Sequence, residues 1–138
     1  MPFTLMAEEG ASLSSGSMRM YAIPNASSLI PNSAVGCVDL YNYDPLNRRT
    51  AVGIMVSKEY RRQGYALAML QALASLYTSD EGVHGGRPLH VLYADIAASN
   101  SASIALFKKA GYEECGHFKE WLNVDGKYID TIRMQKIL

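Results

Sequence analysis

The sequence has few cysteines, a single tryptophan and no excess of charge of either sign. Its two cysteines, Cys37 and Cys115, do not follow a metal-ligand spacing, and we expect both thiols to be reduced. Lysine plus arginine and aspartate plus glutamate each number 13, so the net charge at pH 7 is zero. This balance gives no global attraction to nucleic acid or to an anionic membrane. A disulfide scaffold and a nucleic-acid-binding protein are therefore disfavoured.

Long hydrophobic runs are also lacking. The longest, residues 65–77, is interrupted by Gln71 and Ser75 and is shorter than the roughly 20 residues that a membrane span needs. The N-terminus has no basic segment followed by an apolar one, which disfavours a signal peptide. Because 49% of the 138 residues are hydrophobic, the chain is long and apolar enough for one cored domain. We expect a cytoplasmic protein with no membrane partner, an irregular tail over residues 1–17 and a single domain over residues 18–138.

Hydrophobic periodicity and turn residues predict a mixed order of strands and helices. A short turn at residues 44–47 predicts a hairpin between the second and third strands, and Asn-Val-Asp-Gly at residues 123–126 predicts another. This order is typical of an α/β fold class with one central sheet. The expected strands cover residues 18–23, 34–43, 49–57, 90–96, 113–124 and 127–137, and the expected helices cover residues 64–77 and 100–110.

The most informative segment is a strand, a turn and a helix over residues 51–76, with the turn sequence RRQGYA at residues 61–66. This order brings backbone N–H groups, two guanidinium groups and a helix N-terminus together, a combination that binds phosphate or pyrophosphate. Gly64 lets the backbone turn where a side chain would block the phosphate, and the small Ala66 keeps the first helical turn close to it. Alone the pattern is weak, and a solvated Arg-Arg turn before a core helix is the alternative.

A second segment, NSASIALFKKAGY at residues 100–112, follows in the same order as in a known family. Together the two segments resemble the GNAT superfamily of acyl-CoA-dependent N-acetyltransferases, in particular its ribosomal-protein and spermidine acetyltransferases. The resemblance covers about residues 18–138. It implies a mixed, mostly antiparallel sheet splayed around acetyl-CoA with flanking helices. Family domains begin with a strand and two helices before the strand of residues 18–23, so we expect these elements to be missing here.

The resemblance also implies a set of cofactor contacts. The pantetheine arm of acetyl-CoA would lie between the strands of residues 51–57 and 90–96, with no metal involved. The backbone of Met55 and Val56 would pair with the pantetheine amides. Asn100 and Ser103 would contact the far side of the cofactor, and Asn100 is also a helix N-cap. The pyrophosphate would lie against the loop formed by Arg61, Arg62, Gln63, Gly64, Tyr65 and Ala66.

Acetyl transfer to an amine requires a neutral amine, a polarised thioester carbonyl and a stabilised leaving thiolate. A backbone N–H of the strand at residues 51–57 is the oxyanion donor that the family implies. Many family members carry a tyrosine as general acid where this chain has Phe107, which we keep among the cofactor contacts. Tyr93, Tyr112 or water would then donate the proton. Alternatively the thiolate leaves unprotonated, since thiols have a pKa of about 8.5.

Three carboxylates lie on strands that should approach the acceptor: Asp39, Asp95 and Glu120. We favour Glu120, beside Trp121, for holding a cationic or amine substrate through charge and cation–π contact. Asp95 is the second catalytic candidate. A surface glutamate beside a core tryptophan is the alternative for Glu120. The three histidines are scattered and indicate neither a catalytic nor a metal site: His84, His90 and His117.

The leading hypothesis is an N-acetyltransferase that transfers acetyl from acetyl-CoA to a small amine or a protein N-terminus. We expect direct attack, because no cysteine has a histidine nearby in the sequence. The alternative is a shortened acyl-CoA-binding module with little or no activity, favoured by Phe107 and by the missing N-terminal helices. A nucleotide-binding protein is disfavoured because no Gly-Lys-Ser/Thr follows the loop. A homodimer is a further expectation, since the acceptor half of the site would otherwise be open.

Overall fold

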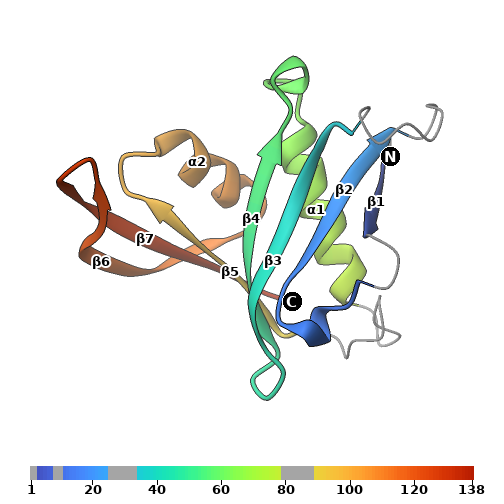
Figure 1. The fold of residues 1–138 in the computed structure, drawn as a ribbon, viewed down its shortest axis with the longest axis horizontal. Helices are drawn as coiled ribbons and strands as arrows, with labels where there is room; N and C mark the ends of the chain where they lie inside the picture. The colour runs from blue at the N-terminus through green and yellow to red at the C-terminus, as the bar shows by residue number, and fades with distance from the viewer. Residues whose placement is uncertain (1–2, 8–10, 25–33, 79–88) are drawn as a thin grey trace.

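The computed structural model describes residues 3–7, 11–24, 34–78 and 89–138. A seven-stranded sheet has the order β1-β2-β3-β4-β5-β7-β6, and only β4 and β5 pair in parallel (Figure 1). The expected mixed, mostly antiparallel α/β sheet is confirmed. The elements are β1 (Phe3–Ala7), η1 (Leu13–Ser15), β2 (Met18–Pro24), β3 (Gly36–Asp44), β4 (Arg49–Val56), η3 (Lys58–Tyr60), α1 (Tyr65–Thr78), β5 (Val91–Ala97), α2 (Ser101–Lys109), β6 (Glu113–Val124) and β7 (Lys127–Ile137).

Strand β1 corrects the expectation of an irregular tail over residues 1–17 and of a missing first strand. Its register with β2 runs from Phe3↔Pro24 to Ala7↔Met20, antiparallel, and the Phe3 side chain is buried in the core. The prediction failed because a strand of five residues is too short to show a clear period. Between β1 and β2, the described residues 11–17 contain the turn η1 and no α-helix.

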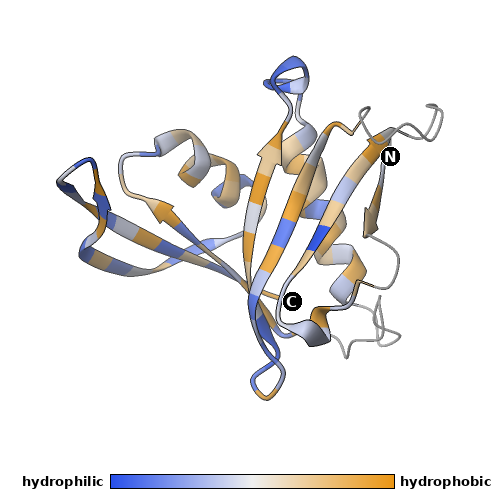
Figure 2. Ribbon diagram, in the orientation of Figure 1, coloured by the Kyte–Doolittle hydropathy of each residue, from blue (hydrophilic) through white to orange (hydrophobic). Residues whose placement is uncertain are grey.

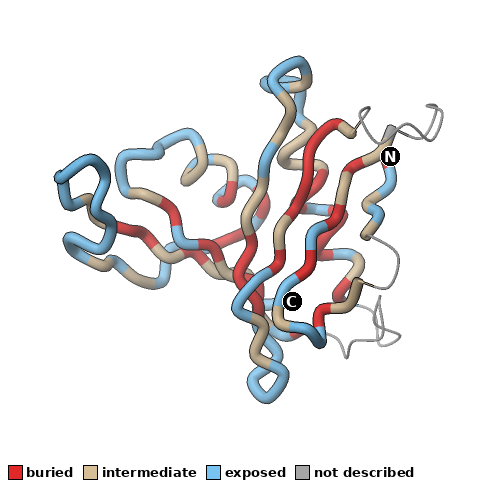
Figure 3. Tube along the Cα trace, in the orientation of Figure 1, coloured by how far each residue is buried: buried red, intermediate tan, exposed pale blue. Residues whose placement is uncertain are grey.

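One face of the sheet packs against α1 and α2 to form the core. Alternate residues of the central strands, such as Leu40, Leu92 and Met134, are fully buried there beside Leu73 of α1. Burying each such side chain stabilises the fold by about 1.5–3 kcal/mol. Figure 3 shows that buried residues lie on the central strands and on α1, while the β6–β7 hairpin is largely exposed at its far end. No helix in the described ranges is both long and apolar enough to cross a membrane.

The opposite face of the sheet is polar and is covered by no helix in the described part of the chain (Figures 1 and 2). We call this surface the open face. It follows from the two-residue period of strands, which sends neighbouring side chains to opposite sides of the sheet. The side chains that define it are Arg19, Asp39, Tyr41, Tyr93, Asp95 and Arg133.

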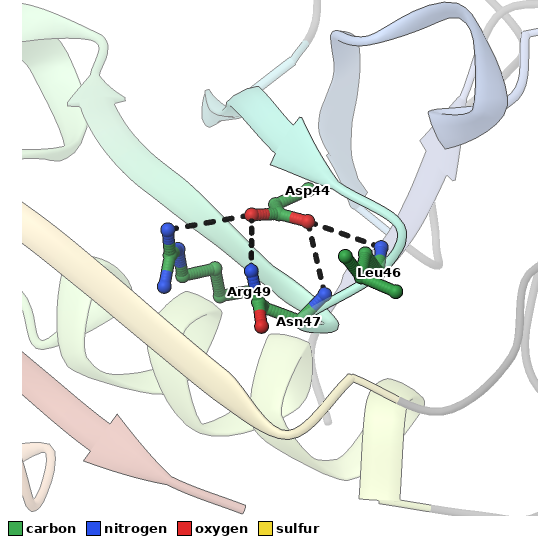
Figure 4. Close-up of polar contacts among 4 residues, drawn as sticks. All are labelled: Asp44, Leu46, Asn47 and Arg49. Carbon is green, nitrogen blue, oxygen red and sulfur yellow. Dashed lines mark hydrogen bonds and ion pairs between the residues drawn. The ribbon is translucent and has the colours of Figure 1, made fainter.

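The turn between β3 and β4 is held by one carboxylate (Figure 4). Asp44 Oδ1 accepts hydrogen bonds from the N–H groups of Leu46 and Asn47, at 3.0 and 2.9 Å. Asp44 Oδ2 accepts from Asn47 Nδ2 at 2.8 Å and lies 3.3 Å from Arg49 Nη2. Aspartate closes turns in this way because its side chain bonds to the backbone two or three residues ahead. The predicted hairpin at residues 44–47 is therefore confirmed.

Candidate active site

Strands β4 and β5 pair at one end and separate at the other. Their parallel register includes only Arg49↔Val91, Thr50↔Leu92 and Ala51↔Tyr93, although β4 continues to Val56 and β5 to Ala97. Figure 1 shows the two strands diverging toward their arrowheads. The backbone of β4 beyond Ala51 therefore has no strand partner on this side. Polar backbone groups need hydrogen-bond partners, so a ligand that lies along β4 would satisfy them.

The register of β3 and β4 decides which backbone groups of β4 face this gap. The N–H of Ser57 donates to the Val35 carbonyl at 2.7 Å, and Met55 pairs with Cys37. Since alternate residues point their backbone groups to opposite sides, those of Met55 face β3 and those of Ile54 and Val56 face the gap. Of the two predicted backbone contacts, this register favours Val56 over Met55, and both stay predictions. Ile54 was missed because only the register reveals it.

A pocket of about 180 Å³ lies at this gap. It brings together residues from both faces, including four of the predicted site residues. A larger hollow of about 470 Å³ on the open face shares Tyr41 with it and includes the Arg19–Asp39 pair. Tyr41 was not predicted, because only the folded sheet brings β3 to the gap. The lining of the smaller pocket is Tyr41, Val52, Gly53, Ile54, Ala94, Asp95, Ile96, Ala97, Asn100, Ser103 and Phe107.

The RRQGYA loop follows β4 directly and ends at the N-terminus of α1. Gly64 has φ +82°, which favours glycine, and the space where a side chain would start is empty to 4 Å. The first helical hydrogen bond runs from the Ala68 N–H to the Gly64 carbonyl, at 3.1 Å. Within the described residues, the N–H groups of residues 62–66 have no acceptor. With the helix dipole behind them, these N–H groups form a site for an anion.

Two side chains of the loop brace it rather than point outward. Arg61 Nε donates to the Val56 carbonyl at 3.1 Å, and Gln63 Nε2 donates to the Glu59 carbonyl at 3.1 Å. The side chain of Arg62 is exposed. Arg61 therefore joins the loop to the end of β4, and Arg62 is the guanidinium left to approach nucleotide phosphates.

Helix α2 supplies the other wall of the pocket. Asn100 Oδ1 accepts from the Ser103 N–H at 3.1 Å, which confirms the predicted N-cap. Phe107 is buried, and its ring meets Tyr112 edge-on with centroids 4.9 Å apart. The Tyr112 hydroxyl is buried without a partner among the described residues, and burial raises its pKa well above the ordinary value. Tyr112 lies behind Phe107 and does not line the pocket, so it is poorly placed as an acid.

Asp95 lines the pocket but is held in an ion pair. Arg133 Nε and Nη2 donate to its two carboxylate oxygens at 2.8 and 2.9 Å. This pairing raises the pKa of Arg133. The guanidinium also stacks on the rings of Tyr93 and Phe118, at 4.7 and 5.2 Å from the centroids. The geometry therefore favours Asp95 as an anchor for a cation.

Glu120 lies away from this pocket. It sits in β6 where the β6–β7 register shifts, with φ 51°, and its N–H donates to Asp130 Oδ1 at 2.8 Å. Its carboxylate does not line the pocket in the gap, and a catalytic role for Glu120 stays a prediction. The neighbouring Trp121 is 64% exposed, so the alternative of a core tryptophan is wrong.

Two of the three histidines, His90 and His117, lie within the described residues. His117 Nε2 lies 2.7 Å from Asp130 Oδ2. The pKa of Asp130 is lowered mainly by the backbone hydrogen bond from Glu120 and, to a smaller extent, by this contact with His117. His90 is exposed, and His84 lies outside the described residues. No group of three or more metal-ligating side chains is found in the described ranges.

Comparison with known proteins identifies the family. Residues 7–113 match the sequence profile of the acetyltransferase (GNAT) domain. The chain belongs to this family. The splayed β4–β5 pair and the loop before α1, described above, are thus features of a GNAT domain.

Two curated relatives and one solved structure are similar to this GNAT chain. It is 27% identical over 101 residues to a spermidine N(1)-acetyltransferase of Vibrio cholerae, covering 72% of this chain and 54% of the relative. It is 28% identical over 117 residues to the Bacillus subtilis protein named "Putative ribosomal N-acetyltransferase YdaF", covering 83% of this chain and 61% of the relative. The chain thus spans little more than half the length of these relatives.

The solved structure is the Vibrio cholerae spermidine N-acetyltransferase in complex with CoA and spermine. Its TM-score to this chain is 0.74 at 21% identity, over 90% of this chain and 67% of that one. At this identity the likeness shows the fold alone.

Proposed function

We propose that this chain binds acetyl-CoA along β4 and transfers its acetyl group to a primary amine by direct attack. The observation that carries the proposal is two sets of backbone groups, one at the end of β4 and one before α1. The N–H groups of Ile54 and Val56 face the gap, and the N–H groups of residues 62–66 have no acceptor within the described residues. A pantetheine arm followed by a pyrophosphate needs this sequence of partners, amide-pairing groups first and anion-binding groups next.

The chain's residues have separate tasks in this proposal. The loop over residues 62–66 holds the pyrophosphate, and Arg61 fixes the loop against Val56. Asn100 and Ser103 contact the cofactor from α2, and Phe107 gives an apolar wall that excludes water from the thioester. The gap-facing N–H groups of Ile54 and Val56 are the donors available to a developing oxyanion. Acetyl-CoA supplies the activated acetyl group as a thioester.

The acceptor approaches from the open face, where Asp39 and Asp95 lie beside the pocket, each paired with an arginine. A primary amine is cationic at neutral pH, so a carboxylate shared with the arginine would hold it before it loses its proton. The names of the relatives favour a polyamine or a ribosomal protein N-terminus as the first acceptors to test. Self-association stays a prediction, which the mass in solution by light scattering would test.

A second candidate is an acyl-CoA-binding module without turnover, favoured by the lack of a hydroxyl at Phe107. Titration calorimetry with acetyl-CoA tests binding, and release of free CoA in the presence of spermidine or an N-terminal peptide tests transfer. We expect micromolar binding that weakens with 3′-dephospho-acetyl-CoA, and amine-dependent CoA release. Binding without release from any amine would favour the module, and absence of binding would overturn both functions.

A further inference from the structure

We propose that Tyr41 supplies the hydroxyl that Phe107 lacks and that it protonates the CoA sulfur as the thiolate leaves. This inference rests on the proposed function. Tyr41 belongs to β3 and Phe107 belongs to α2, yet both residues line the pocket at the gap. Phe107 approaches from the helix side, and Tyr41 approaches from the open face.

The ring of Tyr41 lies next to Gly53, a residue of β4 near the point where the gap opens. A Cβ built on Gly53 would lie 3.7 Å from Tyr41 Cε1 and 3.8 Å from Asp39 Cβ. Gly53 comes two residues after Ala51, the last β4 residue that pairs with β5. Because Gly53 has no side chain, no side chain at this position separates the Tyr41 ring from the closed end of the gap between β4 and β5. A thioester bound along β4 would end within reach of this ring.

The backbone at Tyr41 is fixed in a way that aims the side chain. The β3–β4 register shifts between Tyr41 and Asp44, and Asn42 has φ 51°. Thr50 Oγ1, fully buried, donates to the Tyr41 carbonyl at 2.9 Å. Bulges of this kind often re-aim a side chain beside an active site. The Thr50 contact holds the strand at the position where its regular pairing ends.

Two ion pairs flank Tyr41 on the open face. Arg19 pairs with Asp39 at 2.6 and 3.0 Å, on the β2–β3 side, and Arg133 pairs with Asp95 on the β5–β7 side. In the sheet register Arg19 lies beside Asp39, and Asp39 lies beside Gly53. Burial, with a smaller contribution from the charge of Asp95, raises the pKa of Tyr41. The hydroxyl therefore stays protonated at neutral pH, as an acid must.

The other tyrosines are worse placed. Within the described residues the Tyr41 hydroxyl has no hydrogen-bond partner, and the residue as a whole is 36% exposed. Tyr112 is buried behind Phe107. Tyr93 lies under the Arg133 guanidinium and does not line the pocket. Of Tyr41, Tyr93 and Tyr112, only Tyr41 presents a hydroxyl where the gap between β4 and β5 meets the open face.

The proton balance of the step is complete without another reactant. The amine nitrogen uses its lone pair to form the N–C bond with the acetyl carbon. The C–S bond breaks, and its electron pair goes to the CoA sulfur, which takes the proton of the Tyr41 hydroxyl. The surplus proton of the nitrogen returns to the Tyr41 oxygen through solvent water. The products are the acetylated amine and CoA with a free thiol.

Tyr41→Phe tests the proposal because it removes only the hydroxyl. We expect kcat to fall about 100-fold, the loss typical of a missing general acid, while the Kd of acetyl-CoA changes less than about twofold. Tyr93→Phe is the matched control on the same face and should leave kcat within about twofold. Restoring a hydroxyl at the other wall, with Phe107→Tyr in the Tyr41→Phe protein, should recover part of the lost kcat.

A second measurement does not depend on turnover. The thiol pKa of bound CoA, from the ultraviolet absorbance of the thiolate with desulfo-CoA as baseline, should be higher in Tyr41→Phe than in the unaltered protein. A kcat within twofold of the unaltered enzyme, or an unchanged thiol pKa, would overturn the role of Tyr41 and leave the proposed function standing. An unaltered protein that does not bind CoA would instead overturn the proposed function, and this inference with it.

Discussion

The two faces of the sheet are built from different interactions and do different work. The face under α1 and α2 is held by buried apolar side chains such as Leu73 and Leu92, which contact one another over a continuous core. The open face is held by two exposed Arg–Asp pairs, Arg19–Asp39 and Arg133–Asp95. Surface pairs contribute about 0–1 kcal/mol each, much less than a buried leucine. The apolar face therefore determines the fold, and the side chains of the open face can serve binding or catalysis at little cost in stability.

The gap between β4 and β5 is where these two faces meet. Its walls come from the backbone of β4, from α2 on the apolar side and from Tyr41 and Asp95 on the open side. Substitutions that affect only one of these parts should separate cofactor binding, stability and acceptor recognition.

The largest effect is expected for the loop before α1. Gly64→Glu adds a negative side chain where an anion should bind, and strains a residue with φ +82°. We expect the affinity for acetyl-CoA to fall at least about 100-fold, which corresponds to about 2.7 kcal/mol. Titration calorimetry measures this loss.

Gly126→Glu is the matched control for this variant. Gly126 has φ +84° and equally open surroundings, but lies in the β6–β7 turn. It should suffer the same backbone strain without loss of binding. Equal affinity of the Gly64 variant and the unaltered protein would contradict the assignment of the loop.

The next effect concerns the apolar face. Leu73→Ala in α1 leaves a cavity at a side chain with 0% exposure and should lower the free energy of unfolding by about 2–5 kcal/mol. Urea denaturation measures it. Leu122→Ala, at a leucine that is 38% exposed in β6, should cost much less. Similar losses for both leucines would show that the core is not where the structure places it.

A smaller effect is expected on the open face. Asp95→Asn keeps the shape of the side chain but removes its charge beside the pocket. We expect the apparent KM for the amine to rise about tenfold, with the acetyl-CoA affinity unchanged, because the carboxylate attracts the acceptor and not the cofactor. Steady-state kinetics with spermidine measures the change. Glu120→Gln, outside the pocket, is the comparison, and a larger effect there would favour the original choice of Glu120.

The smallest effect is a pH dependence of stability from the β3–β4 turn. The side-chain and backbone hydrogen bonds from Asn47 lower the pKa of Asp44 below the usual 3.8. A lowered pKa in the folded state contributes stability above the unfolded pKa, and this stability is lost as the pH falls through the folded pKa. Thermal melts of Asp44→Asn and of the unaltered protein should therefore differ at neutral pH and converge as the pH falls through the lowered pKa of Asp44, below 3.8. Parallel curves at every pH would contradict this linkage.

Much of the fold could be predicted because its signals are local. The apolar period of residues 65–77, the Asn100 cap and the Asp44 turn each depend on neighbours a few residues apart. Strand β1 was missed because its few residues show no clear period of their own and form a strand by pairing with β2. Pairing energy comes from a partner distant in sequence, and no local pattern reports it.

The candidate site was predicted in part for the same reason. Asn100, Ser103 and Phe107 follow from a helix that the sequence marks clearly, and they line the pocket. The sequence could not show that Ile54 rather than Met55 turns its backbone groups to the gap, because that side depends on the strand register. Glu120 was chosen from its neighbour Trp121, whereas the folded sheet brings Asp95 to the pocket and leaves Glu120 outside it.

The sequence by itself determined most of the elements, the loop before α1 that we propose binds an anion, and the likeness to the GNAT family, because each depends on residues close together along the chain. Only the tertiary structure decided where β4 leaves β5, which backbone groups face the gap, and that Tyr41 meets Phe107 across one pocket. The physical reason is that hydrogen-bond register and the packing of distant strands set these positions, and both arise only when the whole sheet has formed.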